Sequence, residues 1–511
     1  METASNISRS VLIIGAAVAF GLLWNYFFFD KMPPGIGFTI YIALIVVAYV
    51  FLANYSNRPV RGDLFWIFPL LIFFATMVAI RSSDLLSILN VFACLGLIAL
   101  VMEVSVQGTM RRFIPIDYFK LFWPLKVVQP LIAVCADILS VRHFTDKKNA
   151  QQIVRGILIT VPVVAIFGIL LANADPVFDK YSSFFTHWNL TEETIGRIIF
   201  AVIVTTLAAS FLSYSLTQKA EAAEMRSHAR PLGHIETSIL LGSVNVLFLG
   251  FIAIQLTYLF GGESNIVAQG LTYAEYARRG FFELVAVAVI SYLVLVVTEM
   301  FTAKDTEKHS HAFRILSSAV ILQVGVIMIS AFYRMWLYEE AFGFTTLRLY
   351  THAFVVLLGF VFAFLMYKIL VEHRDNTFAF RTFLVVVVFV AAMNFFNPDA
   401  FIAQKNLERF AVTGDLDAAY LSALSSDATP VLLPALAMTT GKTQHELGHE
   451  FYTRLHREKT QYWMQWNLSR ADEYELLAQN SAQLGKYAAN ADLVYPADTD
   501  SPVDTVQNNS I

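Results

Sequence analysis

Residues 35–54 read GIGFTIYIALIVVAYVFLAN, and this stretch decides the class of fold. It contains no charged side chain, and it has the roughly 20 residues that an α-helix needs to cross the hydrocarbon core of a bilayer. Runs of the same kind recur along the chain, so the sequence predicts about eleven transmembrane helices. The other runs are 11–29, 63–80, 85–104, 153–172, 195–215, 237–260, 281–302, 313–333, 349–371 and 380–396.

The composition of the whole chain agrees with this class. Of the 511 residues, 57% are hydrophobic and 15% are charged, and the mean hydropathy is +0.57. Soluble domains contain about 25% charged residues. We therefore expect an all-α integral membrane protein whose main partner is the lipid bilayer. Envelope or membrane proteins are possible further partners, and we expect no nucleic acid.

One amphipathic stretch, residues 119–141, interrupts the series of spans. It contains two lysines, an aspartate and two prolines, and basic residues flank it on both sides. A true crossing would place one of these basic clusters outside the cell, against the positive-inside rule. We therefore predict that 119–141 is an interfacial or re-entrant segment within a cytoplasmic loop.

The distribution of charge between the loops predicts the orientation. Alternate loops are basic, namely 54–62, 105–152, 216–236, 303–314 and 372–381. The intervening loops are short or more acidic, namely 30–34, 81–84, 173–194 and 261–280. Because basic loops remain in the cytoplasm, the N-terminus is predicted to be cytoplasmic. An odd number of spans then places the C-terminus outside.

The composition changes abruptly after Asn397, where the apolar runs end. The segments 401–412, 415–425, 429–439 and 444–480 have helical periodicity. The sequence therefore predicts a small helical extracytoplasmic C-terminal domain. The full predicted division is a four-span unit (1–104), a basic cytoplasmic loop (105–152), a seven-span core (153–396), the C-terminal domain (397–490) and a disordered tail (491–511).

Residues 445–449 read HELGH, the H-E-x-x-H pattern of zinc peptidases. On a helix, His445 and His449 would share one face and bind the metal, and Glu446 would activate the bound water. His456 falls on the same face. Glu473 and Glu475 follow at a spacing where a carboxylate ligand could lie.

The neighbours of HELGH favour a different interpretation. Tyr452 and Leu455 stand where the extended peptidase pattern requires glycine and histidine. Charged residues surround the motif, and Leu447 and Phe451 form an apolar stripe on another face. We therefore interpret the histidines as the solvated face of an amphipathic helix, and the zinc site remains the alternative.

A second group of charged residues lies in GGESNIVAQGLTYAEYARRGFFE, residues 261–283. Glu275, Arg278, Arg279 and Glu283 are three or four positions apart, so they can pair along one helix. An ion pair between Arg279 and Glu283 would anchor the helix, and a ligand or partner surface is the other interpretation. The residues predicted to contribute to such an outer surface are Asp175, Tyr273, Glu275, Arg278, Arg279, Glu283, Arg334, Arg348 and His352.

Several stretches resemble a bacterial membrane family known only as domain of unknown function family 4173, which is related to family 4153. These stretches are PPGIGFTIYIALIV, LLANADPVFDKY, QLTYLFGGESNIVAQGLTYAEYARRGFFELV, NPDAFIAQKNLERF, DLDAAYLSALSSDATPVLLPAL and WMQWNLSRA. The resemblance implies a polytopic inner-membrane protein with a helical C-terminal region. It implies no activity, cofactor or catalytic residue, and HELGH lies between the matching blocks.

These observations predict a non-enzymatic scaffold, sensor or assembly partner that acts at the outer face of the membrane without a cofactor. A membrane-anchored zinc hydrolase that uses Glu446, His445 and His449 is one alternative. A channel or transporter is the other. Coupled transporters place ionisable groups at the depth of the bilayer centre, and the predicted spans contain few of them.

Overall fold

The computed structural model describes residues 2–58, 60, 62–120, 192–218, 232–259, 281–303, 306–372, 375–457 and 462–489, with the single positions 156, 160, 164 and 167. Within this part of the chain the regular structure is helical, and the one β-pairing is an isolated bridge between Leu232 and Thr302. The predicted all-α fold is therefore confirmed for the described residues.

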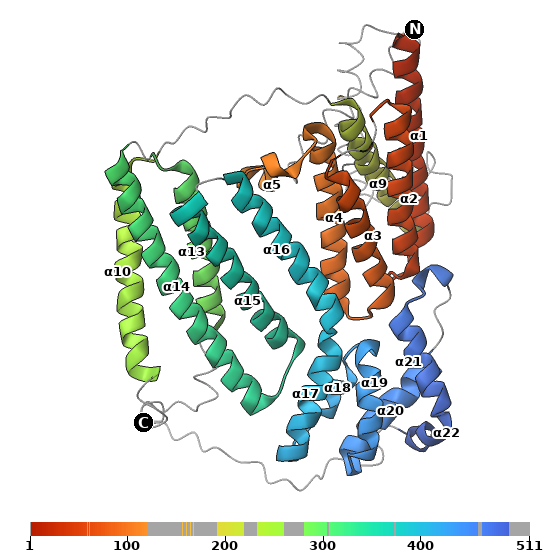
Figure 1. The fold of residues 1–511 in the computed structure, drawn as a ribbon. Coiled ribbons are helices and arrows are strands. Elements are labelled where there is room, and N and C mark those ends of the chain that lie inside the picture. Colours follow the sequence, from red (N-terminus) through yellow and green to blue (C-terminus); the bar gives the residue numbers. More distant parts are fainter. Residues whose placement is uncertain are drawn as a thin grey trace.

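Long apolar helices form the body of the molecule (Figure 1). The first group is α1 (Glu2–Phe28), α2 (Ile36–Tyr55), α3 (Leu64–Ile80), α4 (Asp84–Gln107) and α9 (Glu192–Thr217), with the short η1 (Met110–Arg112) and α5 (Pro115–Lys120) after α4. The second group is α10 (His234–Leu259), α13 (Phe281–Phe301), α14 (Glu307–Phe342) and α15 (Thr346–Tyr367), extended by the π-helix η2 (Lys368–Glu372). Helix α16 (Asp375–Phe396) lies between the two groups.

In the described part of the chain, nine helices are long and apolar enough to cross a membrane, and α3, with 17 residues, is somewhat shorter. Each predicted run except 153–172 overlaps one of these ten helices, and the run 349–371 continues from α15 into η2. The segments 153–172 and 119–141 fall outside the described residues, apart from a few positions at their edges and single residues. A multi-pass membrane protein is thus established, whereas the total of eleven spans stays a prediction.

Each group of helices has its own apolar core. Phe74 and Leu71 are fully buried in the first group, and Val324 and Leu365 are fully buried in the second. The outward-facing side chains are also apolar, since Val47, Leu247 and Ile329 are 63%, 68% and 71% exposed. Apolar exposure on this scale is typical of a surface that contacts lipid.

The C-terminal helices form a third group. They are α17 (Pro398–Thr413), α18 (Ala418–Ser422), η3 (Ser426–Ala428), α19 (Thr429–Leu432), η4 (Leu433–Ala437), α20 (Gly441–His456), η5 (Trp463–Gln465), α21 (Leu468–Gln479), α22 (Ser481–Leu484) and η6 (Gly485–Tyr487). Their buried apolar side chains form a separate core that includes Leu421, Leu436 and Phe451. The segment 444–480, predicted as one helical stretch, is divided because α20 ends at His456 and α21 begins at Leu468.

The C-terminal helices lie against one end of the bundle (Figure 1). The backbone N–H of Ile36 donates to the carbonyl of Trp466 at 2.8 Å, and the N–H of Thr346 donates to the hydroxyl of Tyr420 at 2.7 Å. Gly35 permits this approach, because a Cβ there would lie 2.3 Å from the Trp466 carbonyl oxygen. We call this end, which carries loops 30–35, 81–83 and 343–345, the covered end.

The other end of the bundle, which we call the opposite end, is joined by different contacts. The carboxylate of Asp63, before α3, accepts from the N–H of Met110 at 2.6 Å, and Arg58 donates to the carbonyl of Gln218 at 2.5 Å. Helix α9 begins at the covered end, where Arg197 lies 3.5 Å from Asp30. Helix α4 therefore ends at the opposite end of the bundle, whereas α9 begins at the covered end.

Candidate functional site

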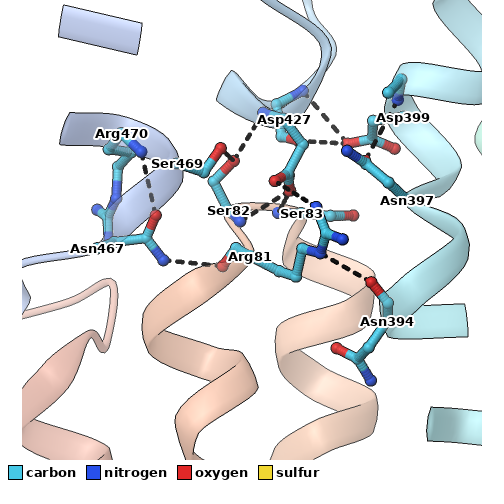
Figure 2. Close-up of polar contacts among 12 residues, drawn as sticks. Arg81, Ser82, Ser83, Asn394, Asn397, Asp399, Asp427, Asn467, Ser469 and Arg470 are labelled. Atoms are coloured by element: carbon cyan, nitrogen blue, oxygen red, sulfur yellow. Dashed lines mark hydrogen bonds and ion pairs between the residues drawn. The ribbon is translucent and has the colours of Figure 1, made fainter. Parts of the chain in front are cut away.

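A polar junction joins the loop between α3 and α4 to the C-terminal helices at the covered end. Asp427 in η3 is 5% exposed, and its Oδ2 accepts from the N–H groups of Ser82 at 2.8 Å and Ser83 at 3.1 Å. Its Oδ1 lies 3.6 Å from Nη1 of Arg81. Figure 2 shows the carboxylate surrounded by these three donors. The junction thus places a buried ion pair between the bundle and the C-terminal helices.

Helix α16 takes part in the same junction. Nε of Arg81 donates to the carbonyl of Asn394 at 2.8 Å, and the side chain of Asn394 exchanges two 2.8 Å hydrogen bonds with the side chain of Asn90. Both asparagine side chains are fully buried. Because an amide inside an apolar bundle is costly unless it is hydrogen-bonded, this reciprocal pair fixes the packing of α4 against α16.

Two further residues of the C-terminal helices complete the junction. Nδ2 of Asn467 donates to the carbonyls of Val78 at 3.1 Å and Arg81 at 2.9 Å, which lie at the C-terminal end of α3. Asp399 in α17 accepts from the hydroxyl of Ser425 at 2.5 Å. Burial raises the pKa of the Asp399 carboxyl, and the nearby charge of Asp427 raises it further.

A second ion pair lies within the C-terminal helices. Arg454 of α20 donates to Glu473 of α21 at 2.8 Å and to Glu450 at 2.9 Å. Glu473 also accepts from the hydroxyls of Ser426 at 2.5 Å and Thr429 at 2.6 Å. Burial disfavours the charged form of Arg454, but the two carboxylates outweigh burial and raise the pKa of the guanidinium. Glu473, which the sequence offered as a metal ligand, is instead held by these donors.

A cavity of about 1380 Å³ opens beside the junction, between α4 and the C-terminal helices. One wall is apolar and comes from α4, with Leu85, Ile88 and Phe92. The other residues that line the cavity, including Asp84 at the start of α4, carry charges of both signs. The arginines are Arg81, Arg454, Arg457 and Arg470, and the carboxylates are Asp84, Asp399 and Glu473.

The four arginines of the cavity differ in their partners. Arg81 and Arg454 form the two ion pairs described above. Within the described part of the chain, Arg457 and Arg470 have no carboxylate within 4.0 Å. The guanidinium of Arg470 is half-buried and donates to the carbonyls of Gln465 at 3.2 Å and Pro34 at 3.4 Å. Burial lowers the pKa of Arg470, and Asp84 and Glu473 oppose this shift in part.

The HELGH residues lie in α20, and the interpretation of a solvated face is wrong for His445. His445 is only 9% exposed, and its ring packs edge-on against the ring of Tyr487, with the centroids 5.4 Å apart. Gly448 permits this contact, because a Cβ there would lie 2.4 Å from Cγ of Tyr487. The predicted burial of Leu447 and Phe451 is confirmed, since they are 0% and 1% exposed.

The other members of the predicted zinc site each contact a residue that does not belong to that site. Nδ1 of His449 lies 2.9 Å from the carbonyl of Tyr487, and Nδ1 of His456 lies 2.8 Å from the carbonyl of Tyr452. Glu446 lies 3.8 Å from Lys442. Among the residues that the structure describes, no three His, Cys, Asp or Glu side chains are grouped closely enough to hold a metal ion.

The predicted ligand surface is only partly visible. Asp175, Tyr273, Glu275, Arg278 and Arg279 lie outside the described residues, and so does the proposed pairing of Arg279 with Glu283. Glu283 is exposed at the start of α13. Arg334 is half-buried in α14.

Two members of that surface lie where α14 passes into α15. His352 lies with Nδ1 3.0 Å from the carboxylate of Glu339 and with Nε2 3.1 Å from the carbonyl of Phe332. Arg348 donates to the carbonyl of Gly343 at 2.5 Å and lies 4.1 Å above the ring of Tyr338. These contacts hold the helix ends together and leave the two side chains little freedom to bind a ligand.

The junction residues were missed in the sequence, although a weak signal was present. The loop between α3 and α4 contains only Arg81, Ser82 and Ser83, so an arginine stands between two apolar helices with few residues around it to pair with. Such an arginine needs a partner from elsewhere in the chain. Ser82 and Asp427 are 345 positions apart, and no local pattern connects them.

The apolar helices and the buried polar contacts between them define a multi-pass helical membrane protein. Residues 68–435 match the sequence model of the family described as "Domain of unknown function (DUF4153)". The chain belongs to this family. The match supports the family that was named as a relative of the resemblance, not family 4173 specifically. No curated protein and no solved structure matches the chain.

Proposed function

We propose that this protein is a non-enzymatic ligand-binding membrane protein, a sensor or scaffold that acts at the outer face of a bacterial inner membrane. The observation that carries the proposal is the cavity of about 1380 Å³, which the bundle and the C-terminal helices line jointly. Its walls come from α4, from Thr346 at the start of α15, and from α17, α20 and α21. A ligand in this cavity would touch the first group of helices through α4, the second group through Thr346, and the C-terminal helices.

The contacts of the charged side chains favour binding over catalysis. Asp427 and Glu473 each accept from several donors, and Arg81 and Arg454 are held in ion pairs. Side chains that are already held by several hydrogen bonds or by an ion pair fix the shape of a cavity, but they are poorly placed to transfer protons. This arrangement supports a receptor or scaffold in preference to the zinc hydrolase.

The proposed orientation rests on which side chains lie at each end of the bundle. The ends of α2 and α4, the start of α14, η2 after α15 and the start of α16 lie toward the opposite end (Figure 1), and these segments or the residues just after them carry Arg58, Arg111, Lys308, Lys368 and Arg381. By the positive-inside rule this end faces the cytoplasm, so the covered end and the C-terminal helices face outward. Helices α4 and α9 end and begin at different ends of the bundle, so the chain between them crosses an odd number of times. We assign that crossing to 153–172, which gives eleven spans and leaves 119–141 on the cytoplasmic side.

A reporter fused to the C-terminus tests this orientation. Alkaline phosphatase is active only outside the cytoplasm, and we expect an active fusion at the C-terminus and an inactive one within 105–118. The reverse pattern would contradict the orientation, and activity at both positions would contradict the odd number of crossings.

Native mass spectrometry tests ligand binding. We expect the protein released from its membrane to carry a bound mass beyond that of the polypeptide. Ser87→Trp on α4 and Ala471→Trp on α21 each place a large side chain in the cavity, and both should reduce the bound fraction. Leu249→Trp is the matched control, because Leu249 is 61% exposed on the outer surface of α10. A wild-type protein without bound mass, or equal retention in all variants, would contradict the proposal.

A further inference from the structure

The apolar wall of the cavity continues onto the surface of α4 that contacts lipid. Ile88, Phe92 and Leu95 are 51%, 66% and 50% exposed, and their spacing places them along one side of the helix. Ile88 and Phe92 also line the cavity. An acyl chain that lies along this side of α4 therefore extends into the cavity without leaving an apolar surface.

The cavity lies at the level where α4 begins, at the boundary between the apolar helices and the polar C-terminal helices. Trp466 and Tyr474 line it and are 46% and 40% exposed. Tryptophan and tyrosine side chains are enriched at the depth of lipid headgroups. The cavity thus offers an apolar wall on the membrane side and polar walls at headgroup depth.

The cavity arginines that have no ion-pair partner among the described residues indicate which lipid headgroup the cavity can bind. Arg81 is offset by Asp427, and Arg454 by Glu473 and Glu450. Among the described residues, Arg457 and Arg470 have no carboxylate within 4.0 Å, and the exposed Asp84, which also lines the cavity, acts on Arg470. A guanidinium presents a planar set of donors that matches a phosphate group.

We propose that the cavity binds a glycerophospholipid, with its phosphate at Arg457 and Arg470 and one acyl chain along Ile88 and Phe92. This inference rests on the proposed function and names the class of its ligand. The volume of about 1380 Å³ supports it, because sites for ordinary small ligands occupy about 300–1,000 Å³. Because the negative charge of Asp84 acts on Arg470, we expect a headgroup that carries a single phosphate charge and not a cluster of them.

Lipid titration followed by native mass spectrometry tests the proposal. The purified full-length protein is freed of bound lipid and titrated with phosphatidylglycerol. We expect the Arg457→Gln/Arg470→Gln variant to bind roughly a hundredfold more weakly, about tenfold for each of the two charge-assisted contacts that it loses. Arg197→Gln is the control, because Arg197 lies at the covered end but outside the cavity, where it pairs with Glu193. Equal loss in the control would mean non-specific annular lipid and would overturn the proposal.

Two further comparisons, at Arg470 and at Ile88, test the proposal if the double variant folds poorly. Arg470→Lys retains the charge and should bind more strongly than Arg470→Gln. Ile88→Trp changes only a lipid-facing wall and should weaken phosphatidylglycerol binding. Glycerol phosphate alone should bind much more weakly than the intact lipid, and equal binding would mean that a free phosphate compound is the ligand. A bound mass that is not a phospholipid overturns this inference alone, whereas absence of any bound mass overturns the proposed function as well.

Discussion

The C-terminal helices contact the two halves of the bundle through different chemistry. Against α3 and α4, the contact is built on Asp427, whose side chain is 2% exposed and faces Arg81 and two backbone N–H groups. Against α14 and α15, the contact is made by hydrogen bonds to neutral groups, and the charged donor among them, Arg409 of α17, donates to the carbonyl of Ala341 at 2.9 Å. Asn406 of α17 accepts from the N–H of Phe344 at 3.0 Å and donates to its carbonyl at 2.9 Å, and Tyr420 accepts from Thr346.

The difference predicts which contact is more sensitive to a single substitution. Removing one partner of a buried ion pair leaves the other charge buried without compensation and costs about 3–5 kcal/mol, whereas a hydrogen bond between uncharged groups contributes about 0.5–1.5 kcal/mol. One substitution at the junction of Arg81 and Asp427 should therefore lower stability more than one substitution at the contact with α14 and α15.

The largest effect is expected for Asp427→Ala. The substitution leaves the guanidinium of Arg81 and the N–H groups of Ser82 and Ser83 without their acceptor, so the free energy of unfolding should fall by about 3–5 kcal/mol. Thermal unfolding in detergent, followed by circular dichroism, measures the change. Asp415→Ala is the control, because Asp415 is 76% exposed and pairs with Arg409 at 3.3 Å, and it should cost less than about 1 kcal/mol. Similar losses in both variants would contradict the expectation that loss of the buried Asp427 costs much more stability than loss of the exposed Asp415.

A smaller loss is expected for Asn406→Ala at the contact with α14 and α15. This variant loses both hydrogen bonds with Phe344, and the free energy of unfolding should fall by about 1–2 kcal/mol. Hydrogen exchange at Phe344 and its neighbours should become faster, while exchange at Ser82 and Ser83 stays unchanged. The control is Gln404→Ala on the exposed side of the same helix, where we expect less than about 0.5 kcal/mol. Faster exchange at Ser82 in the Asn406 variant would show that the two contacts open together.

Tyr420→Phe removes a single hydroxyl from the same side. The N–H of Thr346 loses its acceptor while the aromatic ring stays in place, so we expect a loss of about 1 kcal/mol in the free energy of unfolding. The same unfolding experiment measures it. Tyr462→Phe, at a tyrosine that is 40% exposed, serves as the control. A loss as large as that of Asp427→Ala would mean that the contact with α14 and α15 is as sensitive to a single substitution as the junction of Arg81 and Asp427.

The sequence predicted the membrane helices and missed the junction for one physical reason. A span is a local property, because some twenty consecutive side chains must each suit lipid, and 35–54 therefore identifies α2 without knowledge of its neighbours. The junction is not local. Arg81 and Asp427 are ordinary loop residues until folding brings them together, and nothing within either segment specifies the other.

Helix α20, which contains HELGH, also shows that a local pattern does not predict contacts with distant segments. Helical periodicity correctly assigned Leu447 and Phe451 to the core, because one helix face sets their environment. It assigned His445 to solvent, and this was wrong because Tyr487, about forty residues later, packs over that face. Periodicity predicts which residues share a face, and it does not predict whether another segment covers that face.

The smallest effect is expected from the protonation of Asp399, which accepts from Ser425 beside the Arg81–Asp427 junction. Burial and Asp427 raise the pKa of this carboxyl, while hydrogen bonds from Ser425 and Ser83 lower it, and the net shift is upward from the ordinary value of 3.8. A raised pKa means that the folded state favours the protonated form. The stabilisation is therefore fully present below pH 3.8 and is lost as pH rises through the raised pKa.

Asp399→Asn keeps the shape of the side chain and an acceptor for Ser425 but removes the titration. The variant should equal or exceed the wild type in stability at pH 7, and this advantage should shrink as pH falls toward 4. The comparison must use the difference between the two proteins, because acid also affects the stability of both through groups other than Asp399. Unfolding of both proteins across this pH range measures the difference. A difference that is constant with pH would mean that the raised pKa of Asp399 has no influence on the junction.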